Sequence, residues 1–130
     1  MLPDYQYLLV VDDQAGIRQL LSEFFTGEGY RVELAVNGLE TLAKVRAKKP
    51  ALILLDLKMP QMGGMETLYQ LKSIAPGVPI ILITAYIESL AFDITLEHHV
   101  LVKPFDLGYA LYLVKRILKT PPQLARRYVI

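Results

Sequence analysis

The stretch Tyr7-Leu8-Leu9-Val10-Val11-Asp12-Asp13 places two carboxylates directly after a run of apolar residues. A second run, Ala51-Leu52-Ile53-Leu54-Leu55, ends in the same way at Asp56. Runs that are apolar throughout are typical of parallel strands that are covered on both faces of a sheet. Two such strands predict one cluster of acids at one edge of the sheet. Because like charges at short range repel, this cluster is expected to hold a cation, to shift a pKa, or both.

The rest of the chain alternates short apolar runs with longer amphipathic segments. Apolar side chains recur at helical spacing in residues 14–28, and Gly27 and Gly29 mark the end of that helix. Asn37 is in a position to cap the helix that follows it. The predicted strands are residues 7–11, 31–36, 51–55, 79–84 and 100–102. The predicted helices are residues 14–28, 39–48, from 64 to about 75, a segment of uncertain length between 87 and 96, and 107–119.

This alternation predicts an α/β fold, in which helices cover both faces of a five-stranded parallel sheet in a doubly wound (βα)5 sandwich. Ligands of such sheets bind beyond the carboxyl ends of the strands. Asp12, Asp13 and Asp56 all lie at such ends, Thr84 finishes the fourth strand, and Lys103 follows the fifth. The fold therefore predicts that these side chains meet at one edge.

Composition limits the possible functions of the chain. Its 130 residues fit one domain, expected over residues 1–119 with a tail at 120–130, and 14 basic against 13 acidic residues leave a net charge of +1. This balance gives no argument for DNA binding or for an anionic membrane surface. No apolar run approaches the ~20 residues that span a bilayer. The absence of a signal-peptide pattern favours a cytoplasmic protein, and the absence of cysteine excludes thiolate metal sites.

The expected cluster has the donors of a hard, oxygen-rich metal site, because carboxylates without histidine or cysteine ligands suit Mg²⁺. Lys103 would hold an anionic group opposite the metal, and the hydroxyl of Thr84 would donate a further hydrogen bond. A carboxylate, a divalent cation, a lysine and a hydroxyl are the parts needed for phosphoryl transfer to a carboxylate.

The sequence resembles the receiver domain of bacterial two-component response regulators over about residues 5–119. The resemblance rests on four motifs: Val11-Asp12-Asp13, Leu54-Leu55-Asp56-Leu57-Lys58-Met59-Pro60 with Gly63-Gly64, Thr84-Ala85, and Lys103-Pro104-Phe105. It implies the flavodoxin-like strand order 2-1-3-4-5. It also implies that the Lys103–Pro104 peptide bond is cis.

The resemblance implies a role for each residue of the cluster. Asp56 matches the phosphoacceptor, which takes the phosphoryl group from a sensor histidine kinase. Asp13 and Asp56 match direct Mg²⁺ ligands, Asp12 a ligand that acts partly through water, and Lys58 the residue that offers its backbone carbonyl. Thr84 and Lys103 match the hydroxyl and the ammonium that contact the phosphoryl oxygens.

Within the family, the sequence is similar to stand-alone receivers of the sporulation phosphorelay type. Val11-Asp12-Asp13-Gln14 with Gly16-Ile17-Arg18, and Thr84-Ala85-Tyr86, carry this likeness. The implied function is a monomeric single-domain response regulator that relays its phosphoryl group to a phosphotransferase, catalysing its own phosphorylation rather than turning over a substrate. The alternative is a binding module that is switched by phosphorylation and regulates a target protein without onward transfer.

The likeness to the first helix of such a receiver predicts that an exposed apolar position within residues 14–21 joins the partner surface.

The segment from Thr84 to Lys103 departs from the family pattern. It is about three residues shorter than in the sporulation type, so the helix within it is expected to be short, irregular or mobile. Val100 stands where many receivers have an aromatic switch residue, and Tyr86 is a candidate substitute in packing. His98 and His99 are interpreted as surface or strand-entry residues, with metal binding or pH sensing as the alternative. Tyr109 and Tyr112 fit either a partner contact or simple packing.

Overall fold

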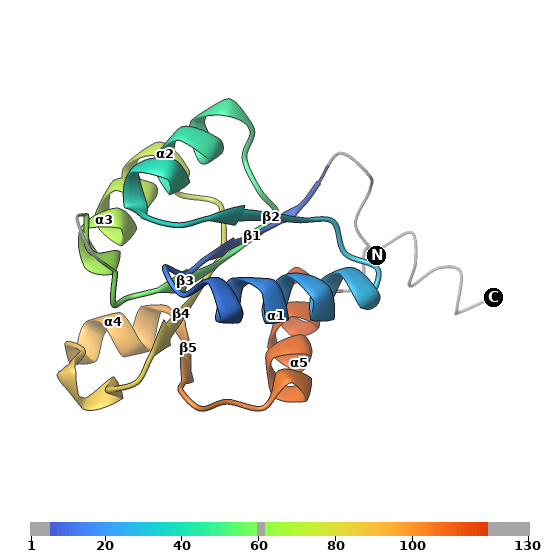
Figure 1. Ribbon diagram of the computed structural model, residues 1–130. Coiled ribbons are helices and arrows are strands. Elements are labelled where there is room, and N and C mark those ends of the chain that lie inside the picture. Colours follow the sequence, from blue (N-terminus) through green and yellow to red (C-terminus); the bar gives the residue numbers. More distant parts are fainter. Residues whose placement is uncertain (1–5, 60–61, 120–130) are drawn as a thin grey trace.

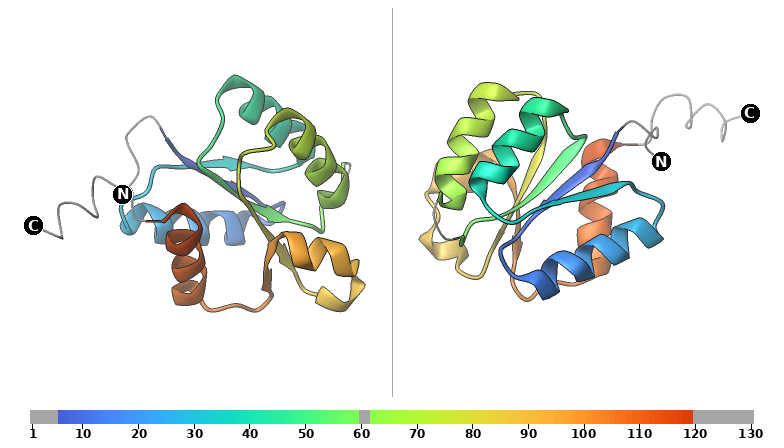
Figure 2. Two further views of the ribbon diagram at one scale, coloured as in Figure 1. Left: turned by 180° about the vertical axis from the view of Figure 1, so that it is seen from behind. Right: turned by 45° about the horizontal axis from the view of Figure 1, so that its top comes forward.

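The computed structural model describes residues 6–59 and 62–119 as a parallel sheet with helices on both faces (Figures 1 and 2). The strand order β2-β1-β3-β4-β5 confirms the predicted doubly wound fold and its order. The strands are β1 (Leu8–Val11), β2 (Val32–Ala35), β3 (Leu52–Asp56), β4 (Ile80–Thr84) and β5 (His99–Val102). The helices are α1 (Ala15–Gly27), α2 (Gly38–Ala47), α3 (Gly64–Ile74), α4 (Phe92–Glu97) and α5 (Leu107–Leu118), with a 3-10 turn at Ile87–Ser89. The predicted tail, residues 120–130, and Pro60 of the third-strand motif lie outside the described residues.

Two hydrophobic cores lie on opposite faces of the sheet. On one face, alternate residues of the central strands, such as Leu9 and Leu55, pack with apolar residues of α2, α3 and α4. On the other face, the intervening residues, such as Val10 and Leu54, pack with α1 and α5. Figure 1 shows α1 and α5 together on the side of the sheet away from α2 and α3. Covering both faces explains why β1, β3 and β4 are apolar on both sides apart from Asp56 and Thr84 at their ends.

The predicted boundaries differ from the structure mainly at two places. Strand β3 includes Asp56, which the prediction placed just beyond the strand, because the backbone of Asp56 still pairs with Ile83 of β4. The predicted helix between residues 87 and 96 is divided, since Leu90 has extended dihedral angles between the 3-10 turn and α4. Helix α4 is therefore only six residues long, as the shortened segment predicted.

Helix α2 has the cap that the sequence predicted, although it begins at Gly38, one residue before the predicted start. The side chain of Asn37 accepts a hydrogen bond of 2.8 Å from the backbone N–H of Glu40 and so caps the helix. Helix α5 has a comparable cap at Asp106, whereas Ala91, which precedes α4, offers no side-chain acceptor. Among the described residues, no helix is long and apolar enough to cross a membrane.

Candidate metal centre

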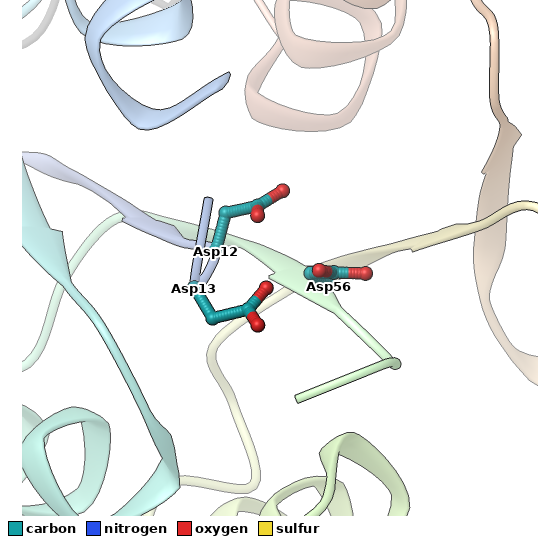
Figure 3. Close-up of side chains that lie close together, drawn as sticks. All are labelled: Asp12, Asp13 and Asp56. Atoms are coloured by element: carbon teal, nitrogen blue, oxygen red, sulfur yellow. The ribbon is translucent and has the colours of Figure 1, made fainter. Parts of the chain in front are cut away.

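The three acidic residues meet where two neighbouring strands end. Strands β1 and β3 pair in parallel with Val11 opposite Leu55, so Asp12 and Asp56, the next residue of each chain segment, lie side by side. One oxygen from each of Asp12, Asp13 and Asp56 lies within 4.8 Å of the others (Figure 3). Asp12 and Asp56 are buried, at 0% and 2% exposure, while Asp13 is exposed. The predicted cluster is thus present, with two buried carboxylates and one open to solvent.

Backbone donors hold both buried carboxylates in place. The N–H of Gln14 donates to Asp12 Oδ1 at 2.9 Å, and the N–H of Lys58 donates to Asp56 Oδ1 at 3.2 Å. Each donor lies two residues after its acceptor, so the bond forms within the loop that leaves the strand. These bonds occupy Oδ1 of each acid, and Oδ2 of each acid lies toward Lys103.

Lys103 directly follows the edge strand β5, and its side chain extends to the same two acids. Its Nζ lies 3.4 Å from Asp12 Oδ2 and 3.7 Å from Asp56 Oδ2. The Lys103–Pro104 peptide bond is cis, as the resemblance implied. The backbone N–H of Lys103 donates to the carbonyl of Thr84 at 2.7 Å, which joins the ends of β4 and β5. Lys103 is therefore an inward-facing cation at the centre.

Thr84 and Lys58 lie beside the acids in different ways. Thr84 is buried at the end of β4, and its hydroxyl accepts a hydrogen bond of 3.1 Å from the N–H of Tyr86. The residue Lys58 is exposed, and it meets the site through its backbone. The metal contact assigned to its carbonyl stays a prediction.

Burial and repulsion outweigh attraction at Asp56. Burial, and next the negative charge of Asp12, raise the pKa of Asp56 from 3.8 to about 6, with a smaller contribution from Asp13. The N–H of Lys58 and the charge of Lys103 act in the opposite direction. Most Asp56 carboxyl groups are still ionised at neutral pH, and a divalent cation bound between the acids would favour the ionised form further.

The donors present fit Mg²⁺. Carboxylates that converge within 4.8 Å, two of them buried and one exposed, supply hard oxygen ligands and leave room for water. The charge of the cluster also favours a cation, because it holds three carboxylates and Lys103 pairs with two of them, Asp12 and Asp56.

Two residues support the centre in ways that the motifs did not reveal. Arg18, named from the sequence only within the motif Gly16-Ile17-Arg18, donates from Nη1 to the backbone carbonyl of Asp12 at 2.8 Å. Gly64 lies so close to the backbone after Asp56 that an added Cβ would come within 2.3 Å of the Cα of Leu57. Arg18 thus fixes the loop of Asp12, and Gly64 lets α3 pack against the loop of Asp56. The pair Gly63-Gly64 was the only sequence signal for the second contact.

The remaining candidates lie away from the acids. Val100 packs at the edge of the core, and the side chain of Tyr86 is 60% exposed. Tyr109 and Tyr112 are half-exposed and stack at 6.1 Å between ring centroids, so they form a surface pair rather than core packing. His99 is exposed at the start of β5, and His98 is partly buried before it.

Comparisons with known proteins agree with this geometry. The sequence model of the response regulator receiver domain matches residues 8–117. The chain is 42% identical over 114 residues to sporulation initiation phosphotransferase F of Bacillus subtilis, covering 85% of this chain and 92% of that protein. It is 46% identical over 105 residues to the transcriptional regulatory protein ZraR of Klebsiella oxytoca, covering 76% of this chain but 23% of that protein.

Solved structures show the same likeness. The response regulator TrrA of Thermotoga maritima, in complex with Mg²⁺-BeF, aligns with a TM-score of 0.79 and 33% identity, covering 88% of this chain and 99% of that one. The chemotaxis protein CheY4 of Vibrio cholerae aligns with a TM-score of 0.75 and 31% identity, covering 85% and 97%. Together with the strand order and the acidic centre, these matches show that the chain belongs to the response regulator receiver domain family of two-component systems.

Proposed function

We propose that this receiver domain accepts a phosphoryl group on Asp56 from a sensor histidine kinase and relays it to a phosphotransferase. The observation that carries the proposal is the environment of Asp56. A buried carboxylate that is ionised at neutral pH lies next to two further acids and 3.7 Å from a lysine ammonium. This combination supplies a nucleophile, a cation site and a counter-charge at one point.

In the proposed reaction, a carboxylate oxygen of Asp56 attacks the phosphorus atom and the phosphorus–nitrogen bond to the kinase histidine breaks. The product is an acyl phosphate on Asp56 and a free histidine on the kinase. Asp12, Asp13, Asp56 and the carbonyl of Lys58 would hold Mg²⁺, which neutralises phosphoryl charge when bound.

Lys103 and Thr84 would stabilise the transferred group. Lys103 Nζ lies 3.4 and 3.7 Å from the buried acids, longer than a good charge-assisted hydrogen bond, so a phosphoryl oxygen can compete for it. The hydroxyl of Thr84, which accepts from Tyr86, keeps its own proton to donate to a second phosphoryl oxygen. Lys103 and Thr84 would both contact phosphoryl oxygens, and neither would form a covalent bond to the group.

An apolar groove beside Lys103 supports the proposal that a kinase and a phosphotransferase bind next to Asp56. It measures about 380 Å³ and is lined by Ile17, Leu20 and Leu21 of α1 together with Lys103, Pro104, Phe105 and Leu107. Leu20 is 48% exposed whereas Leu21 is buried, so Leu20 is the open apolar position that the sequence predicted on this helix. We propose that a helix of the kinase or phosphotransferase packs its apolar side into this groove, next to Asp56.

A labelling experiment tests phosphoryl acceptance. Incubation of the chain with Mg²⁺ and acetyl phosphate should give an acid-stable, base-labile adduct on Asp56, detected by intact-mass and peptide mass spectrometry. EDTA and Asp56→Asn should both abolish the adduct. The control is Glu66→Gln, an acid-to-amide change at an exposed position of α3, which should label normally. Labelling of the Asp56→Asn protein at the wild-type level would contradict the proposal.

Transfer to a phosphotransferase separates the relay from a second candidate function. In that alternative, phosphorylation switches a binding surface that regulates a target protein, and it is favoured by the likeness to the much longer ZraR. Phosphorylated chain is mixed with a histidine phosphotransferase, and the label is followed. Movement of the label to the histidine supports the relay. Retention of the label, with phosphorylation-dependent binding of a target, supports the switch.

A matched pair of leucine variants tests the groove. Leu20→Ala should slow phosphoryl transfer from the kinase, because it removes apolar area from the proposed contact. Leu39→Ala, at an exposed position of α2 that does not line the groove, should transfer at the wild-type rate. Equal rates in the two variants would exclude the groove as the partner surface.

We further propose that the receiver occupies residues 1–119, with residues 120–130 as a tail, and that the protein acts as a monomer in the cytoplasm. Truncation after residue 119 should leave labelling of Asp56 unchanged. Sedimentation of the full chain at micromolar concentration should give a single monomeric species.

A further inference from the structure

His98 connects the short helix α4 to the edge strand β5. It is the residue that ends α4, and its backbone N–H donates to the carbonyl of Ile94 at 3.1 Å. Strand β5 starts at the next residue and runs toward Lys103. We define residues 94–101 as the α4–β5 corner. A change in the state of His98 therefore acts on the last turn of α4 and on the first residues of the strand that leads to Lys103.

The ring of His98 is partly buried, and its Nε2 atom is buried without a partner among the described residues. Its Nε2 is shielded from solvent and has no hydrogen-bond partner within residues 6–59 and 62–119. A buried, unpaired nitrogen is costly when neutral and much more costly when the ring carries a charge. The packing of this corner therefore favours the neutral imidazole.

The charges that act on His98 come from three elements. Lys72 belongs to α3, Glu97 to α4 and His99 to β5, and all three influence the ring. Glu97 is the only acid among them, and its Oε2 is paired with Lys72 Nζ at 2.7 Å. The side chain of Ile117, from α5, lines the same surface pocket as His98 and contributes no charge. Among the described groups, the acid nearest in sequence to His98 is thus already engaged by a lysine.

We propose that the α4–β5 corner responds to pH through His98. In its closed form, the structure described above, His98 is neutral. When His98 takes up a proton, the corner shifts toward an open form, in which the hydrogen bonds of residues 94–101 break and the ring is hydrated. This response rests on the buried Nε2 of a partly buried imidazole at the junction of α4 and β5, unpaired among the described residues, while the adjacent acid Glu97 is paired with Lys72. Protonation would place a second positive charge beside Lys72 and would demand hydration of Nε2, and both effects favour opening. This inference concerns the fold of the corner and does not depend on phosphoryl transfer.

The direction of the pH dependence follows from the electrostatics. Burial, and next the charge of Lys72, lower the pKa of His98 below its ordinary 6.5, although Glu97 acts in the opposite direction. The open form, with an ordinary pKa, then binds a proton more readily than the closed form. Stability of the corner is therefore fully present above about pH 6.5 and is lost as the pH falls from there toward the lower pKa of the closed form.

Amide hydrogen exchange on the full chain tests the proposal, with rates corrected for the intrinsic effect of pH. Between about pH 7.5 and pH 5.5, the protection of amides in residues 94–101 should fall about three- to tenfold in the wild type. His98→Gln, which cannot titrate, should remove this dependence. His99→Gln is the matched control, because His99 is the neighbouring residue and is exposed, and it should behave as the wild type. Asp56 also titrates near this range, but both variants retain it.

A titration of the wild type gives a second measurement that needs no variant. The imidazole resonances of His98 and His99, followed by NMR, should show a lower pKa for His98. Equal pH dependence of exchange in His98→Gln and His99→Gln, or a His98 pKa at or above 6.5, would overturn the proposal. A low His98 pKa together with a dependence that His98→Gln removes would establish it.

Discussion

The acidic centre and the α4–β5 corner lie at opposite ends of the sheet, and they treat buried polar groups differently. At the centre, both oxygens of Asp12 have a partner, the N–H of Gln14 for one and Lys103 for the other. At the corner, Nε2 of His98 has no partner in the described ranges. An exposed ion pair between Lys72 and Glu97 links α3 to α4 there. A site that must hold charge is thus fixed by backbone donors, whereas the corner depends on a neutral ring staying neutral.

The largest expected effect is a loss of folding stability from an added side chain at Gly64, which packs against the loop that follows Asp56. Gly64→Ala would place a Cβ 2.3 Å from the Cα of Leu57 and 2.8 Å from the carbonyl oxygen of Asp56. Because the atoms it meets are backbone, the loop after Asp56 must shift, at a cost of about 1–3 kcal/mol or more. Urea unfolding measures the loss.

The adjacent glycine provides the control for this change. A Cβ on Gly63 would meet nothing within 4 Å, so Gly63→Ala should unfold close to the wild-type midpoint. Equal losses in the two variants would mean that the close approach of α3 to the Asp56 loop is not what Gly64 provides.

The next effect is the response of the acidic centre to Mg²⁺. A cation bound only by the folded state adds about 2.7 kcal/mol at a hundred times its dissociation constant, so the unfolding midpoint should rise with Mg²⁺ and return with EDTA. Asp13→Asn, which removes the exposed carboxylate of the cluster, should weaken the rise. Asp106→Asn is the control, because asparagine also caps a helix and Asp106 lies outside the acidic cluster. A rise that Asp13→Asn leaves unchanged would exclude these acids as the metal site.

A smaller effect is expected from giving α4 the cap that it lacks. Ala91 has extended dihedral angles at the start of α4, so Ala91→Ser can accept a hydrogen bond from the first turn. The stability of α4 should increase by about 0.5–1 kcal/mol, which would be seen as slower amide exchange within the helix. Ala43→Ser, at an exposed position inside α2, has no cap to form and should give no gain there. Unchanged exchange in Ala91→Ser would show that the missing cap does not limit α4.

The smallest effect is expected from Glu97→Gln, which breaks the exposed pair with Lys72. Exposed ion pairs contribute little to global stability, so the urea midpoint should stay near the wild type. The pKa of His98 should fall further, because Glu97 is the charge that raises it. NMR titration of His98 checks this shift, with Glu23→Gln on α1 as the control. A rise in the His98 pKa would contradict the assigned electrostatics of the corner.

Much of the fold could be predicted because its signals are local. The strands β1, β3 and β4 are apolar except for Asp56 and Thr84 at the ends of β3 and β4. The cap at Asn37 is a side chain next to its helix, and the acids lie at the ends of their strands. The predicted end of β3 was one residue short because Asp56 interrupts the apolar run while its backbone still pairs with Ile83. Periodicity reports side-chain burial and not backbone pairing, so a polar residue that ends a strand is easily placed outside it.

The sequence by itself determined the order of elements and the presence of an acidic edge, because apolar periodicity selects strands and helices, and parallel strands bring their carboxyl ends together. Only the tertiary structure decided that Arg18 braces the loop of Asp12, that Gly64 touches the backbone of Leu57, and that Leu20 is open while Leu21 is buried. It also decided that Nε2 of His98 is buried without a partner. Some of these contacts join residues that are close in the chain, such as Arg18 and Asp12. Each still depends on how a helix packs against a neighbouring strand or loop, which no local preference sets.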